Sequence, residues 1–94
     1  MFFHATHKHN YQTCPAHNAD VKAQFMGALQ SAEEKGVKVH GMYTDVPGHT
    51  IFMVLESDSV EKLVAFFDPI VDLGDTDIRP VTAPINAIAI LQDN

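Results

Sequence analysis

The chain has 94 residues, 46% of them hydrophobic, which suffices for one folded domain over residues 1–94 and is too short for two. Its formal net charge is −6 and its six Lys and Arg residues form no cluster, so we expect no binding to nucleic acid or to an anionic membrane. No apolar stretch approaches the ~20 residues that span a bilayer, no secretory signal is recognisable, and a single cysteine allows no internal disulfide, so we expect a cytoplasmic protein.

Three predicted elements make up the N-terminal third of the chain. Residues 2–9 mix aromatic, small and polar residues over the length of a strand, and residues 10–18 contain a Cys-Pro pair that favours a loop, because proline disfavours helix just before it. Over residues 20–35 apolar side chains recur at three- and four-residue steps, which predicts an amphipathic helix. Asn18 or Asp20 can cap its start.

A β-hairpin is predicted next. Residues 37–44 alternate as a strand does, and a further strand is predicted over residues 49–55. The Val-Pro-Gly sequence at 46–48, between the two strands, is typical of a turn.

A second helix and extended segments complete the chain. Asp58 with Glu61 three residues later resembles a capping box, and an apolar stripe follows until Pro69, which should end or kink the helix. The extended segments 78–81 and 85–91 each have a proline within or just before them. Because proline removes a donor from the strand ladder, we place these segments at a sheet edge, or in a strand broken by a bulge.

The order β-α-β-β-α-β predicts an α+β, ferredoxin-like fold, with a four-stranded antiparallel sheet and two helices on one of its faces. Residues 50–55 are apolar on both faces of their strand, which a half-solvated sheet tolerates poorly. We therefore expect a second copy of the chain to cover the other face, in a homodimer.

Several short sequence features extend this prediction to a family. They are Glu56 at the end of the third strand, Asp72-Leu73 after the second helix, Pro80-Val81 in the last strand, His7-x-His9, the Thr13–His17 stretch, His40-Gly41 and His49-Thr50. With them the chain resembles the dimeric α+β barrel superfamily over nearly its whole length, in particular its small single-domain members. The resemblance implies a homodimer whose sheets enclose a barrel-like cavity, in a superfamily that includes small isomerases, quinol monooxygenases and haem-handling enzymes.

Histidine is the most informative residue type in the composition, with six copies. In the expected strand order 4-1-3-2, the strand ends bring four of them and one cysteine to the same edge of the sheet. The candidate metal ligands are His7, His9, Cys14, His17 and His49. His7 and His9 point the same way on one strand, roughly 6.5–7 Å apart by Cα. Completed by the others, they match the ligands of zinc, copper or iron, and no spacing selects one metal.

Each candidate ligand also has a structural interpretation. His7 and His9 could be a solvent-tolerant strand end, and His49 could be exposed in a turn. Cys14 could be a small packing residue, and His17 could merely precede the helix cap. His4 should point to the opposite face from His7.

His40 is the candidate catalytic residue, as a general acid or base near neutral pH. If the hairpin pairs Thr44 with His49, one set of side chains looks into the dimer cavity and another faces the helices. The first set is His40, Met42, His49 and Met53; the second is Phe52 and Val54. A hydrogen-bonded core histidine is the alternative for His40.

Two functions follow from these residues. The first is a homodimer that binds a transition metal through the histidine cluster at the barrel mouth. The alternative is a cofactor-free isomerase or monooxygenase-like enzyme that acts on a small apolar compound in the barrel cavity. A third interpretation is an accessory dimer whose histidines tune the interface with pH.

Overall fold

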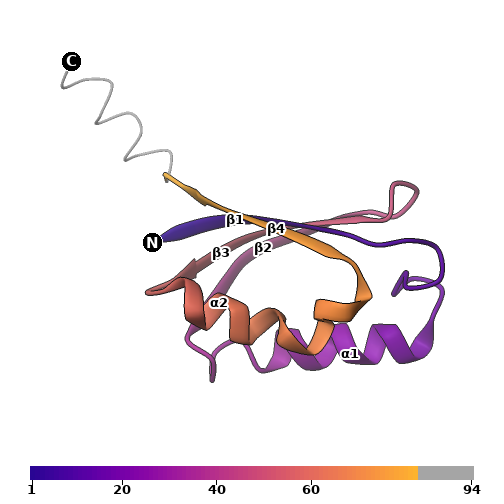
Figure 1. Cartoon of the computed structure of the whole chain (residues 1–94), viewed down its shortest axis with the longest axis horizontal. Helices are drawn as coiled ribbons and strands as arrows, with labels where there is room; N and C mark the ends of the chain where they lie inside the picture. The colour runs from indigo at the N-terminus through magenta and orange to yellow at the C-terminus, as the bar shows by residue number, and fades with distance from the viewer. Residues whose placement is uncertain (83–94) are drawn as a thin grey trace, which may run out of the picture.

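The computed structural model describes residues 1–82, which form one antiparallel sheet with both α-helices on the same face (Figure 1). In chain order the elements are β1 (Phe2–Lys8), α1 (Ala19–Gln30), β2 (Val37–Asp45), β3 (Thr50–Ser57), α2 (Val60–Phe67), the 3₁₀ helix η1 (Asp68–Leu73) and β4 (Asp75–Val81). The strands lie in the order β2-β3-β1-β4. The predicted ferredoxin-like fold and strand order are thus confirmed, with β4 at an edge. The predicted segment 85–91 lies outside the described residues.

Side chains cap the starts of both helices. Asn18 Oδ1 accepts hydrogen bonds from two amides of the first turn of α1, at 3.1 and 3.2 Å, which confirms one of the two predicted caps. In α2 the cap is Ser59, whose Oγ accepts from the Lys62 amide at 3.3 Å. The capping box predicted at Asp58 is wrong, because this carboxylate accepts from Lys62 Nζ at 3.2 Å instead.

Helix α1 ends at Gln30 and does not continue to residue 35 as predicted. Ser31 Oγ donates to the Ala28 carbonyl at 2.9 Å, which satisfies a carbonyl at the helix end. Residues 31–36 form turns that finish at Gly36, whose φ of 75° is easily adopted by glycine.

The core lies between the sheet and the helices. Side chains along β1 and β3 alternate between buried and partly exposed, as expected for strands packed on one face. The largest fully buried apolar side chains are Phe3, Met53, Leu55, Leu63, Phe66 and Ile70. Burial of each such side chain stabilises the fold by about 1.5–3 kcal/mol. The packing of the sheet against the helices therefore contributes strongly to the stability of the fold.

The pairing within the β2–β3 hairpin differs from the prediction. Thr44 pairs with Ile51, so the predicted pairing of Thr44 with His49 is wrong. The register also shifts at His40, which is an extra residue in β2 and forms a β-bulge.

The bulge separates side chains that were predicted to share a face. Met42 pairs with Met53, which is only 2% exposed in the helix-facing core, whereas Phe52 is 36% exposed on the other face. The methionines therefore face the helices, and Phe52 and Val54 do not, the reverse of the prediction. Because the bulge resets the alternation along β2, His40 lies on the face away from the helices, beside Phe2.

The sheet face away from the helices, which we call the open face, carries several apolar side chains. Phe52 and Val81 are 36% and 41% exposed, and the ring of Phe52 lies 6.2 Å from that of His4. His4 thus lies on the opposite face from His7, as predicted. Within residues 1–82, none of the helices has the length and apolar character needed to cross a bilayer.

Candidate metal centre

Three segments meet at one end of the sheet, on the right-hand side of Figure 1. His9 directly follows β1, Cys14 lies in the loop between β1 and α1, and His49 is the last residue of the turn between β2 and β3. The His9 amide donates to the His49 carbonyl at 2.9 Å, which ties the strand end to the turn. One ligand atom from each of His9, Cys14 and His49 lies within 4.8 Å of the others. We call these three residues the His-Cys-His group.

Local hydrogen bonds shape the loop that carries Cys14. Asn10 Oδ1 accepts from the amides of Gln12 and Thr13, at 2.8 and 3.1 Å, in a turn typical of asparagine. The Cys14 carbonyl then accepts from the His17 amide at 3.1 Å. The Cys14 side chain is directed into the protein, with only 2% of the residue exposed.

The backbone of His49 is strained. Its φ is 53°, in the left-handed region, where a residue other than glycine costs roughly 1–2 kcal/mol. Two hydrogen bonds hold the turn, from the Gly48 amide to Asp45 Oδ1 at 3.1 Å and from the His49 amide to the Val46 carbonyl at 3.2 Å. Strain of this kind concentrates at functional sites, so a histidine here suggests a use for its imidazole.

The donor atoms of the His-Cys-His group are free to bind a ligand. Within residues 1–82, Nδ1 of His9 and Nδ1 of His49 are buried without a hydrogen-bond partner, and Cys14 is a free cysteine. Buried polar atoms normally have partners, so the two imidazole nitrogens need an explanation. Two nitrogens and one sulfur suit zinc, copper or iron. Donors on one tetrahedral zinc ion lie roughly 3.4–3.7 Å apart, so a closure of about 1 Å would complete three bonds.

Burial keeps the neighbouring imidazoles neutral. Burial, and then the charge of His9, lowers the pKa of His7 from 6.5 to about 4, against a smaller opposite effect of Asp75. Burial, and then the charge of His49, also lowers the pKa of His9. Of the two, only His9 belongs to the His-Cys-His group, and a metal ion would not have to displace a proton from its ring near neutral pH.

His7 and His17, the other two predicted ligands, are not part of the His-Cys-His group. His7 is completely buried, with its ring centroid 5.7 Å from that of His9 and its Nδ1 2.9 Å from Thr76 Oγ1. His17 is exposed. Sequence reasoning missed Thr76, because only the pairing of β1 with β4 brings this residue opposite His7.

His40 lies away from this group, on the open face. Its Nε2 is 2.7 Å from Glu56 Oε1, and its ring centroid lies 5.1 Å from that of Phe2. The hydrogen bond with His40 is the main cause that lowers the pKa of Glu56. Glu56 is one of the features that carried the family resemblance, but its contact with His40 depends on the β2 bulge, which no local pattern signalled.

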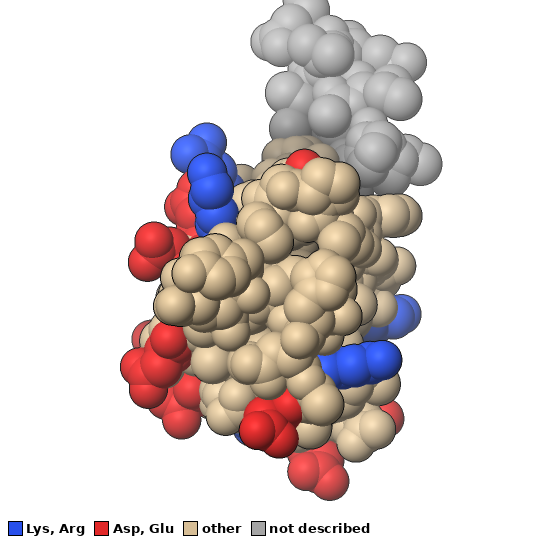
Figure 2. All heavy atoms as spheres, turned by 90° about the vertical axis from the view of Figure 1, so that its right-hand side faces the viewer, with Lys and Arg blue, Asp and Glu red and all other residues tan. Residues whose placement is uncertain are grey.

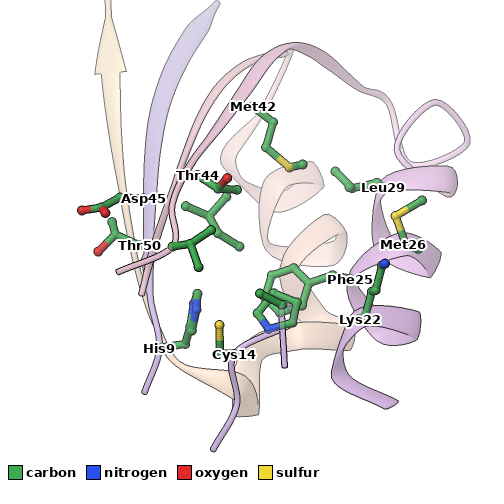
Figure 3. Close-up of a pocket in the computed structure, with 14 residues that line it drawn as sticks. His9, Cys14, Lys22, Phe25, Met26, Leu29, Met42, Thr44, Asp45 and Thr50 are labelled. Atoms are coloured by element: carbon green, nitrogen blue, oxygen red, sulfur yellow. The ribbon is translucent and has the colours of Figure 1, made fainter. Parts of the chain in front are cut away.

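An apolar cavity of about 230 Å³ adjoins His9 and Cys14. Figure 3 shows these two side chains at one end of the cavity, with Met42, Leu29 and Met26 toward the other. The sequence analysis placed Met42 on the same face as His40, toward the dimer cavity. Met42 instead lines the cavity on the helix-facing side of the sheet, because its side chain points there beyond the bulge.

The surface at this end of the molecule is mainly uncharged. Figure 2 looks onto this end and shows uncharged residues across the middle of the face, with acidic and basic side chains mainly around its margins. A ligand that approaches the His-Cys-His group from this side therefore meets little charge.

Comparisons with known proteins agree with this fold. The profile of a family described as "Domain of unknown function (DUF3303)" matches residues 1–94, and no curated protein matches the chain significantly. A crystal structure of SCO4226 from Streptomyces coelicolor A3(2) is similar, with 20% identity, a TM-score of 0.59, and coverage of 88% of this chain and 100% of that chain.

A second similar structure is the 5-chloro-2-hydroxyhydroquinone dehydrochlorinase TftG from Burkholderia phenoliruptrix AC1100, in complex with 2,5-dihydroxybenzoquinone. It has 17% identity, a TM-score of 0.63, and coverage of 92% of this chain and 98% of that chain. At such identities the likeness concerns the fold alone, here the arrangement of one antiparallel sheet with two helices on one face.

Proposed function

The chain belongs to the DUF3303 family, and from this starting point we propose that it binds one transition-metal ion through His9, Cys14 and His49. The observation that carries the proposal is the convergence, within 4.8 Å, of two imidazoles and a buried thiol from three separate segments. The unpartnered Nδ1 atoms of both histidines and the left-handed φ of His49 support it further.

The ligand set narrows the choice of metal to zinc, copper or iron. Nitrogen and sulfur donors suit these ions better than magnesium or calcium, which prefer oxygen. Three protein ligands leave a fourth position open on a tetrahedral ion, which is typical of zinc sites that bind a water or a substrate. Purely structural zinc sites usually have four protein ligands.

Metal analysis of protein purified without a histidine tag tests this proposal. We expect metal in the protein as isolated, and a rise in unfolding free energy of about 2.7 kcal/mol when free zinc is at 100 times its Kd. His9→Ala and Cys14→Ser should lose both effects. His17→Ala, a change at an exposed histidine close in sequence, should keep both. Equal metal loss in the control variant, or no metal-dependent stabilisation of the natural sequence, would contradict the proposal.

We also propose a homodimer in which the open faces of two sheets meet. The exposed apolar side chains of Phe52 and Val81 support this arrangement, because contact with a second copy would remove them from water. Phe52→Lys should give a monomer in analytical ultracentrifugation. Val64→Lys, at a residue 60% exposed on α2, should leave the dimer intact. A monomeric natural protein, or a dimer that persists in Phe52→Lys, would rule the arrangement out.

A second candidate function is cofactor-free catalysis by His40 on a small apolar compound held between the two sheets. Its support is the 2.7 Å contact of His40 with Glu56, since a carboxylate that orients an imidazole is a common device for general acid–base chemistry. The side chain of His40 is 31% exposed, so a substrate can reach it. Turnover of small quinols that is lost in His40→Ala but kept in His9→Ala would support this function. Loss in His9→Ala alone would reject it.

A further inference from the structure

Building on the proposed metal centre, we propose that the same site takes a second ligand, a molecule with one aromatic ring and a single donor atom. The ring would fill the apolar cavity beside His9 and Cys14, and the donor atom would take the fourth position on the metal. The cavity and the His-Cys-His group are then two halves of one binding site.

The size of the cavity sets the size of the ligand. An apolar cavity of about 150 Å³ suffices to bind benzene in another protein, and sites for drug-sized molecules have about 300–1,000 Å³. The cavity here has about 230 Å³. It therefore has room for one aromatic ring with a substituent, and it is smaller than the sites that hold drug-sized molecules.

The position of the cavity gives the ligand access to the metal. His9 and Cys14 belong both to the His-Cys-His group and to the cavity lining. Figure 3 shows their nitrogen and sulfur atoms near each other at the same end of the cavity. A metal ion held by these two residues and His49 would therefore lie against the cavity, within reach of a molecule bound there.

The rest of the lining is suited to a ring. It consists largely of apolar side chains from α1, β2 and the start of β3, namely Phe25, Met26, Leu29, Met42 and Ile51. Aromatic and methionine side chains pack well against an aromatic ring. Lys22 and Asp45 add one positive and one negative charge to the lining, so the side chains alone favour neither sign of charge. A metal cation at the end of the cavity would favour a donor that binds as an anion, as a phenolate does.

The experiment uses the full chain with cobalt(II) in place of zinc, because cobalt reports its ligands through its visible absorption. The probes are 4-fluorophenol, which has a donor atom, and fluorobenzene, which has none. We expect 4-fluorophenol to change the cobalt spectrum saturably and fluorobenzene to leave it unchanged. In fluorine NMR of the zinc-loaded protein both probes should bind, 4-fluorophenol at least about tenfold more tightly, and each should displace the other.

Two variants test whether the ring occupies the cavity. Leu29→Phe adds carbon atoms to the lining and should weaken both probes at least about tenfold without changing the cobalt spectrum of the ligand-free protein. Gln30→Phe, which introduces a phenylalanine at the exposed neighbouring residue of α1, is the control and should leave probe binding unchanged. If Leu29→Phe fails to fold, Met42→Trp serves the same purpose, because Met42 lines the cavity but is 41% exposed.

The outcomes separate this inference from the metal proposal. If cobalt binds but 4-fluorophenol leaves its spectrum unchanged, the second ligand is ruled out and the metal site stands. Unchanged probe binding in the cavity-filling variant also overturns the inference. If cobalt does not bind at all, both proposals fail, and saturable fluorobenzene binding would then assign the cavity to apolar ligands alone.

Discussion

Replacing His49 separates its role in the backbone from its role as a ligand. His49→Ala and His49→Gly both remove the imidazole, but only glycine relieves the left-handed backbone at φ 53°. The strain is worth about 1–2 kcal/mol, and the greater freedom of unfolded glycine offsets about 0.5–1 kcal/mol of it. We therefore expect the metal-free His49→Gly protein to be more stable than His49→Ala by about 0.5–1 kcal/mol, the reverse of the order expected within a helix or strand.

Urea unfolding with a chelator, and again with zinc, measures both effects. Zinc at 100 times its Kd should add about 2.7 kcal/mol to the natural protein and nothing comparable to either variant. If the alanine variant is as stable as the glycine variant without metal, the strain argument is refuted. If either variant keeps the zinc stabilisation, His49 is not a ligand. The two results are independent, so one part of the reasoning can fail while the other stands.

Three further predictions concern stability. Gly74→Ala should destabilise the protein by roughly 1–3 kcal/mol. The Cβ added at residue 74 would collide with the Lys8 carbonyl oxygen and lie 2.9 Å from His7 Nε2. At Gly27 an added Cβ would have no described residue within 4 Å, so Gly27→Ala should instead stabilise α1 by up to about 1 kcal/mol. Equal effects of the two variants in urea unfolding would contradict this pair of predictions. The pKa of His7 in the folded protein lies below its unfolded value of 6.5. Its contribution to the free energy of unfolding is therefore present above pH 6.5 and is lost as the pH falls toward 4. The metal-free protein should thus lose about 3 kcal/mol in acid, and an unchanged pH profile in His7→Gln would show that another group is responsible. Asn18→Ala should lower the free energy of unfolding, measured by thermal unfolding, by about 1 kcal/mol. An unchanged stability would mean that water replaces the hydrogen bonds of this cap.

The order and nature of the elements could be predicted from local patterns. Apolar periodicity identified both helices and the hairpin, and Pro80 marked an edge strand, because these signals depend on residues close together in the chain. Element ends were less predictable. Helix α1 stops at Gln30, where Ser31 Oγ donates to the Ala28 carbonyl and the Ala32 amide donates to the Leu29 carbonyl three residues back. Such turn hydrogen bonds differ little in free energy from those of a longer helix.

The candidate site could be predicted only in outline. Strand order alone indicated that His9, Cys14 and His49 lie at one end of the sheet, since antiparallel topology fixes which strand ends meet. It did not separate them from His7 and His17. His7 turns into the core and contacts Thr76 of β4, a residue distant in sequence, and His17 remains at the surface.

By itself the sequence determined the ferredoxin-like arrangement and the identity of the residues with metal-binding chemistry. Only the tertiary structure decided which of them converge, that His40 pairs with Glu56 on the open face, and that the cavity lies toward the helices. The physical reason is the bulge at His40 and the left-handed turn at His49. Each resets the direction of the side chains that follow, and each depends on pairing between strands, which periodicity within one strand does not record.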